Sequence, residues 1–101
     1  MNLEILDLHQ NKIEDEGARA IGENNTWEKV VKLDLSSNKI NEKPTIISLC
    51  GNGSWKDLKY LFLKDNQAVL EVTEALKAIE GVASKSLEKI DLPGASFEQV
   101  L

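Results

Sequence analysis

The fold is decided by the stretch LEILDLHQNKI at residues 3–13, in which apolar residues and one asparagine follow the spacing LxxLxLxxNxI. The same spacing returns at residues 30–40 and at residues 58–68, where alanine takes the last apolar position. A fourth copy begins at Leu87, so the copies start at residues 3, 30, 58 and 87. Copies at such regular intervals predict that the whole chain is one array of stacked structural repeats.

Each repeat contains a short segment in which leucine or isoleucine occupies every second position. The alternating segments are residues 6–8, 33–35, 61–63 and 90–92. A period of two is typical of a half-buried β-strand. One such strand buries too little apolar surface to be stable by itself, whereas stacked copies bury a continuous ladder of leucine, isoleucine and valine.

An asparagine follows each of the first three strands, at Asn11, Asn38 and Asn66. A turn buried between coils leaves backbone groups without partners, and an asparagine side chain can both donate and accept hydrogen bonds. We therefore expect these asparagines to stack as a short ladder. The fourth copy has Ala95 at this position, just after Pro93-Gly94, which predicts a changed turn or an end to regular stacking.

Helical patterns lie between the strands, over residues 14–23, 42–50 and 67–82. Pro44 fits the second helix only in its first turn. Trp27 and Trp55 each stand three residues before a repeat, and we expect them to close the core beneath the turn into the strand. Spacings of three and four predict the inward side chains, which are Ala18 and Ile21, then Ile46, Ile47, Leu49 and Cys50, then Val72, Ala75, Leu76, Ile79 and Ala83.

The repeat resembles the leucine-rich repeat family, and the run from Asn11 to Ile21 resembles its ribonuclease-inhibitor-like subclass. The resemblance extends over residues 2–97. It implies an α/β solenoid, a horseshoe segment with about four parallel strands on the concave side and helices on the convex side. It also implies protein binding, which is the function that the family shares, and it implies neither an enzymatic activity nor a cofactor.

The composition argues against several classes of partner. The 101 residues carry 12 basic and 17 acidic side chains, giving a net charge of −5, which disfavours nucleic acid or an anionic membrane as the main partner. No apolar run approaches the roughly 20 residues that span a bilayer. The chain starts without a basic segment followed by an apolar one and has one cysteine, so we expect a cytoplasmic protein.

We expect one domain over residues 1–101, and both of its ends are unusual for a solenoid. The chain starts directly on a repeat strand, and Val100-Leu101 falls inside the stretch where a fourth helix is expected. No polar capping repeat is visible, although solenoids need such caps. Three explanations follow: a fragment of a longer array, a fourth repeat that acts as a degenerate cap, or self-association through the uncapped ends.

The register predicts which side chains face solvent on the concave side. Tyr60 and Phe62 fall on one strand face, and an exposed aromatic pair with a charged rim has the composition of a protein-binding hot spot. The pair could instead pack against a neighbouring lysine stem or make a contact of its own. The candidate binding residues are Tyr60, Phe62, Asp34, Lys32, Lys89, Asp91, Lys64 and Asp7. Ser36 and Pro93 are expected on the same solvent-facing side.

Two patterns on this face invite a catalytic or metal-binding interpretation. Asp7, Asp34 and Asp91 share one column, but Phe62 interrupts it, and lysines of the next column are near enough to neutralise the carboxylates. His9 lies near Asp7 and the serines of the next strand, yet an open sheet offers no cleft and no oxyanion donor. We therefore favour cross-strand ion pairs, with no catalytic residue and no metal ion.

From these patterns we expect a non-enzymatic protein-interaction module that binds another protein through its concave sheet. One alternative is a structural spacer within a longer leucine-rich-repeat protein. Another is a regulator of a small GTPase, as some proteins of the family are, although the only arginine, Arg19, is expected on the convex side and gives no support to a transition-state role.

Overall fold

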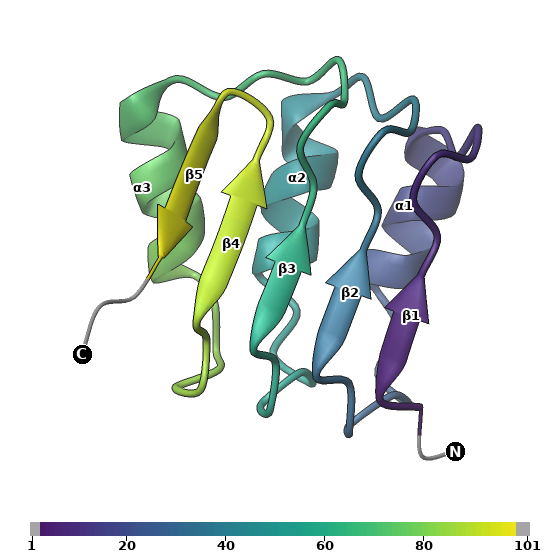
Figure 1. The fold of residues 1–101 in the computed structure, drawn as a ribbon, viewed down its shortest axis with the longest axis vertical. Coiled ribbons are helices and arrows are strands. Elements are labelled where there is room, and N and C mark those ends of the chain that lie inside the picture. Colours follow the sequence, from purple (N-terminus) through teal and green to yellow (C-terminus); the bar gives the residue numbers. More distant parts are fainter. Residues whose placement is uncertain (1–2, 99–101) are drawn as a thin grey trace.

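Strands and helices alternate along the chain, as the repeat predicts (Figure 1). The computed structural model describes residues 3–98. The strands form one sheet in the order β1-β2-β3-β4-β5, in which the first four are parallel and the last runs antiparallel to its neighbour. The strands are β1 (Ile5–Asp7), β2 (Lys32–Asp34), β3 (Tyr60–Phe62), β4 (Lys89–Leu92) and β5 (Ala95–Glu98), and the helices are α1 (Asp15–Gly22), α2 (Lys43–Cys50) and α3 (Val72–Glu80).

The pairing register confirms the alignment of the four repeats. Leu6 pairs with Leu33, Leu33 with Leu61, and Leu61 with Ile90, so equivalent residues of successive repeats stand side by side in the sheet. A slip of one residue would turn a strand's buried side chains to the solvent face. The fold is therefore the α/β solenoid that the spacing predicts.

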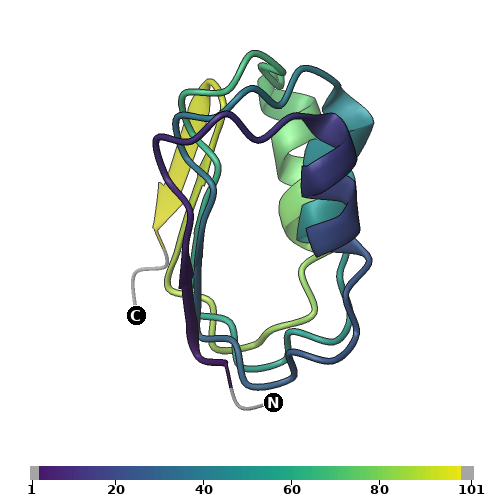
Figure 2. The same cartoon turned by 90° about the vertical axis from the view of Figure 1, so that its right-hand side faces the viewer.

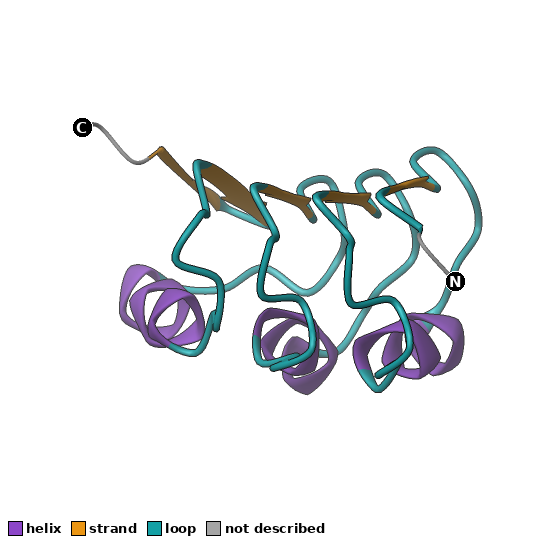
Figure 3. Ribbon diagram, turned by 90° about the horizontal axis from the view of Figure 1, so that it is seen from below, coloured by secondary structure: helices purple, strands orange, loops and turns teal. Residues whose placement is uncertain are grey.

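The core lies between the sheet and a single layer of helices, which covers one face of the sheet (Figures 2 and 3). The leucines predicted to face inward in the second and third repeats are at most 1% exposed, namely Leu33, Leu35, Leu61 and Leu63. Trp55 is 2% exposed and closes the core beneath the turn into β3, as expected, while Trp27 is half-buried. The opposite face of the sheet, called the open face here, is not covered by any helix of residues 3–98.

The predicted asparagine ladder is confirmed at Asn38 and Asn66. The Nδ2 atom of Asn38 donates to the carbonyl of Leu35 in its own turn and to that of Leu8 in the preceding turn, both at 3.0 Å. Its Oδ1 atom accepts from the backbone N–H of Ile13 at 3.1 Å. Asn66 repeats this arrangement one coil later. Each of these two side chains therefore satisfies backbone groups of two successive coils.

A shared backbone conformation sets up these turns. Gln10, Ser37 and Asp65, each directly before a ladder asparagine, have φ angles of 56°, 57° and 57°. This left-handed conformation costs roughly 1–2 kcal/mol in a residue other than glycine. Its recurrence in three coils shows that the turn is imposed by the stacking and not by the residue type.

The fourth repeat ends in a hairpin instead of leading toward a helix. The changed turn predicted at Pro93-Gly94 is confirmed, because β5 folds back along β4 immediately after it. Gly94 has a φ of 90°, and a Cβ at this position would meet the Cγ1 of Val69 at 2.7 Å, so both conformation and space require glycine. Val100-Leu101, expected within a fourth helix, lie outside the described residues.

The first two helices lie where the pattern predicts them, and the third differs. α1 and α2 fall within one residue of the expected 14–23 and 42–50, and Pro44 is in the first turn of α2. α3 begins at Val72, five residues later than expected, because Glu71 caps it. The Glu71 side chain accepts from the backbone of Glu74, whose own side chain accepts from the Glu71 N–H at 3.0 Å.

The inward face predicted for α3 is partly wrong. Ala75 and Ala78 are buried, whereas Val72 and Leu76 are 65% and 47% exposed. The rotation of the helix explains this, since Glu74 accepts from Lys43 of α2 at 3.0 Å and its flank of α3 therefore faces α2. Val72 and Leu76 each lie two residues from Glu74, about 200° around the helix, and therefore on the far flank.

Two other helical positions also depart from the expected inward set. Ile47 of α2 is 46% exposed, and Ala83 lies after α3 on the surface. The remaining inward residues of α2, which are Ile46, Leu49 and Cys50, are buried as predicted. Within residues 3–98, no helix has the length and apolar character needed to cross a membrane.

The asparagine ladder predicts unequal effects of two matched substitutions. Asn66→Ala leaves the Ile40 N–H and the Leu63 carbonyl without their partner inside the protein and removes one of the two amide donors of the Leu35 carbonyl, so we expect it to lower the free energy of unfolding by about 2–4 kcal/mol. Asn11→Ala removes bonds only from an exposed turn and should cost less than about 1 kcal/mol. Urea unfolding followed by circular dichroism measures both, and equal losses would contradict this role of the ladder.

Candidate functional site

The open face of the sheet is built from the side chains that alternate with the buried leucines. The parallel register brings Ile5, Lys32, Tyr60 and Lys89 into one row and Asp7, Asp34, Phe62 and Asp91 into the next. Adjacent strands lie about 4.8 Å apart, so each row forms a contiguous strip across the sheet. Side chains that are 27 to 29 residues apart in sequence thus become direct neighbours.

The aromatic cluster at the centre of this face consists of Tyr60, Phe62 and Lys32. The two ring centroids are 6.1 Å apart, with the planes tilted by 39°. The Nζ atom of Lys32 lies 5.5 Å from the centre of the Phe62 ring, which is the geometry of a cation–π contact. Both alternatives left open from the sequence, a ring–ring contact and a lysine cover, are therefore present, and both rings are half-buried.

Tyr60 is also tied to the next repeat. A hydrogen-bonding interaction with the Glu88 carboxylate, together with its negative charge, raises the pKa of the Tyr60 hydroxyl. Glu88 is exposed on the segment that leads into β4. The cluster therefore has the Lys32 cation on one side and the Glu88 anion on the other, which gives it polar groups of both signs for a partner to match.

The β1 side of the open face carries an acidic group made of Asp7, His9 and Asp34. The Nδ1 atom of His9 hydrogen-bonds to the Oδ1 atom of Asp7, and the His9 N–H donates to the same oxygen at 3.2 Å. This hydrogen bond and the charge of Asp7 raise the pKa of His9, and the same bond lowers the pKa of Asp7. Asp34 accepts from the Ser36 hydroxyl at 2.6 Å.

These contacts decide what the acidic group can do chemically. Potential ligand atoms of the three residues all lie within 4.8 Å of one another, so they are the residues that could approach a divalent cation. However, Asp7 already accepts hydrogen bonds from His9, and Asp34 accepts them from Ser36. The Ser36 hydroxyl proton is directed at Asp34, so Ser36 is not prepared as a nucleophile for His9. As it stands, the group is a hydrogen-bonded ion-pair network.

Three residues expected to face solvent are buried. Asp91 is 7% exposed, in a strand that lies between β3 and β5. Ser36 is 8% exposed because its side chain folds onto Asp34. Pro93 is buried where the chain turns back from β4 into β5. Of the candidate lysines, Lys64 is exposed and Lys89 is half-buried.

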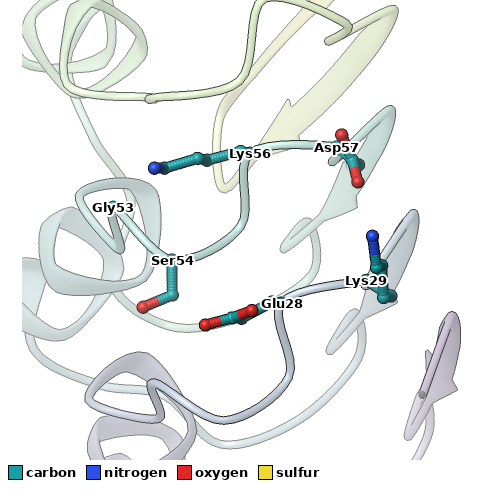
Figure 4. Close-up of a pocket in the computed structure, with 6 residues that line it drawn as sticks. All are labelled: Glu28, Lys29, Gly53, Ser54, Lys56 and Asp57. Carbon is teal, nitrogen blue, oxygen red and sulfur yellow. The ribbon is translucent and has the colours of Figure 1, made fainter.

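A surface pocket that the sequence analysis did not predict lies between the loops that enter β2 and β3 (Figure 4). It has a volume of about 400 Å³ and is lined by Glu28, Lys29, Gly53, Ser54, Lys56 and Asp57. Because its acidic and basic side chains balance, it favours neither an anion nor a cation. It lies at the loop edge of the sheet and not on the open face.

The loops beside this pocket are joined at Asn24 and Asn52, which both begin the sequence pattern Asn-x-Ser/Thr of a glycosylation acceptor. Asn52 donates to the carbonyls of Gly22 at 3.0 Å and Asn24 at 2.8 Å. The Asn24 side chain accepts from the N–H groups of Thr26 and Trp27. Both side chains therefore stabilise turns between coils.

Two leucine-rich-repeat family models match the chain, one over residues 1–22 and one over residues 29–52. They coincide with the first two of the predicted repeats. No curated protein and no solved structure matches significantly. Residues 1–22 and 29–52 are thus similar to leucine-rich repeats, and the finer assignment to the ribonuclease-inhibitor-like subclass stays a prediction.

The His9–Asp7 contact predicts how the charge on the β1 side of the open face changes with pH. Because Asp7 favours the imidazolium form, His9 should titrate above its ordinary pKa, and Asp7→Asn should return it toward that value. As pH rises through the His9 pKa, the imidazolium of His9 loses its positive charge, and the β1 side of the open face becomes more negatively charged. NMR titration of the His9 ring protons measures this, and identical pKa values in both proteins would contradict the contact.

Proposed function

We propose that this chain is a non-enzymatic protein-interaction module whose open face binds another protein, with the aromatic cluster as its anchor. The observation that carries the proposal is the juxtaposition of Tyr60, Phe62 and Lys32 at the centre of a face without helices. Aromatic residues at the centre of a charged surface are typical of residues that dominate binding energy. The presence of leucine-rich repeats supports the same general function by analogy.

The charges around the cluster suggest the chemistry of the partner. The side toward β1 carries Glu4, Asp7 and Asp34, whereas beyond β2 both signs are present, with exposed Lys59 and Lys64 at the two ends of β3 and Glu88 beside Tyr60. A partner with basic groups facing the acidic β1 side would be guided into one orientation. Such complementary charge increases the association rate and selects the register more than it raises affinity.

The buried cysteine supports a role without thiol chemistry. Burial raises the pKa of Cys50 to about 12, so its thiolate is scarcely populated near neutral pH. A cytoplasmic location, where a single reduced thiol is ordinary, is part of the same proposal.

The alternatives have less support. Regulation of a small GTPase through Arg19 is disfavoured because its guanidinium donates to Glu42 at 3.1 Å, within the helix layer on the face opposite the cluster. A spacer role predicts no binding by the open face at all. A binding measurement after substitution of the aromatic cluster therefore distinguishes the spacer from the protein-interaction module.

The double variant Tyr60→Ala/Phe62→Ala should weaken partner binding at least about tenfold, since loss of a central aromatic anchor costs about 2 kcal/mol or more. The measurement is quantitative pull-down from a lysate of the source organism, followed by titration with the recovered partner. The matched control is Lys77→Ala/Glu80→Ala, which alters exposed residues of α3 on the helix side. Circular dichroism verifies that the aromatic variant is folded. Equal recovery by all three proteins would refute the open face as the site and favour the spacer.

A further inference from the structure

The end of the solenoid formed by β1 and α1 exposes its apolar core. Leu6, Leu8 and Ile13 of the first repeat are half-buried, while their counterparts in the second and third repeats are at most 3% exposed. Figure 3 shows β1 and α1 together at this end of both layers. The end face, defined by Leu6, Leu8, Ile13, Ile21 and Gly17, thus presents the surface that each following coil uses for stacking.

β1 has backbone N–H and C=O groups that point away from β2, where another strand could pair with them. Leu8 and Gln10 donate their N–H groups to β2 and the residues after it, and the Glu4 carbonyl accepts from Val31 and Lys32. In a parallel pair, residues whose backbone groups face the neighbour alternate with residues whose groups face away. The N–H and C=O groups of Ile5 and Asp7 therefore point away from β2, at the edge of the sheet.

On the helix side, the end face consists of the small Gly17 and the apolar Ile21 of α1. Asp15 accepts from the N–H groups of Asn41 and Glu42, and Arg19 donates to Glu42, so the flank with these two side chains faces α2. Gly17 and Ile21 lie two residues further on, about 200° around α1, on the flank turned away from α2. A glycine next to a half-buried isoleucine leaves room for a second helix to approach.

We propose that the end face binds a second copy of this chain across a two-fold axis, with β1 running antiparallel to the partner subunit's β1. Leu6 would lie opposite the partner subunit's Leu6, and Ile5 opposite the partner subunit's Asp7. This is the hydrogen-bonded arrangement of an antiparallel pair, because the two residues with outward backbone groups face each other. A two-fold axis perpendicular to the sheet keeps both helix layers on one side, so the two sheets become one.

The dimensions and charges are compatible with such a dimer. The molecule measures 31 × 30 × 19 Å, and its end face spans the strand direction and the sheet-to-helix direction. About 600 Å² per subunit is the lower end for specific interfaces, which a face of this size can supply. No carboxylate lies directly opposite another, because Asp7 faces Ile5. This surface is distinct from the aromatic cluster, so the proposal goes beyond the function proposed above.

Sedimentation equilibrium of the 101-residue chain from about 5 to 500 µM tests the proposal. The expected result is a rise in mass from 11.2 kDa to twice that value and no further. Each copy carries a net charge of −5, so added salt should strengthen the association. A monomer at every concentration would overturn the proposal, and a different protein would then be the candidate occupant of the end face. Masses that grow beyond the dimer would overturn it in favour of head-to-tail stacking.

A pair of variants at one residue separates edge pairing from other contacts. Ile5→Pro removes an N–H that points away from β2, so it should spare the fold while weakening dimerisation by about 10- to 100-fold. Ile5→Ala keeps the N–H and should weaken it by only a few fold. Equal effects of the two substitutions, with both variants folded by circular dichroism, would refute strand pairing.

A cysteine at the axis gives an independent readout. Leu6→Cys should form a disulfide with the same residue of the second copy under mild oxidation, because opposed residues of a non-hydrogen-bonded antiparallel pair lie within disulfide range. The unmodified chain is the control, since Cys50 is buried. Failure of Leu6→Cys to cross-link in a sample that sediments as a dimer would rule out this axis.

Discussion

Stacking of coils is the constraint on which the rest of this structure depends. A single coil of about 28 residues has only a three- or four-residue strand and a helix of two turns, too little to enclose a core. Leu33 and Leu61 become fully buried only because a coil lies on each side of them. The hydrogen bonds of Asn38 and Asn66 act in the same way, since each side chain satisfies backbone groups of two coils. Apolar burial and polar satisfaction therefore fix the same register.

The open face follows directly from that register. Because equivalent residues align across the strands, a position that is free to vary in one repeat becomes part of a strip that crosses the sheet. Tyr60 and Phe62 meet Lys32 only through this alignment. The sequence of one repeat sets the scaffold, and the differences between repeats set the chemistry of the surface.

The sequence predicts most of the fold because the asparagines and leucines recur at fixed intervals, and each recurrence constrains the next. It predicts the rotation of α3 poorly, since Val72 and Leu76 continue the apolar pattern although the flank of α3 that faces α2 is that of Glu74. It also misses the burial of Asp91 and the fifth strand beside it, which no repeat position encodes. Placement of the candidate site could be predicted, but the covering of Phe62 by Lys32 required side-chain positions.

The ladder of asparagines has a direction, and this has a consequence for how the array tolerates shortening. Asn38 completes the turn of the coil before it, through Leu8 and Ile13, while Asn11 donates to carbonyls of its own turn. Deleting a coil from the carboxyl side would remove the asparagine that completes the turn of the coil before it, whereas deleting the first coil would leave the turn of the second coil with both Asn38 and Asn66. The asparagine ladder thus runs one way, from each coil to the coil before it, although the backbone hydrogen bonds of the sheet join neighbouring coils in both directions.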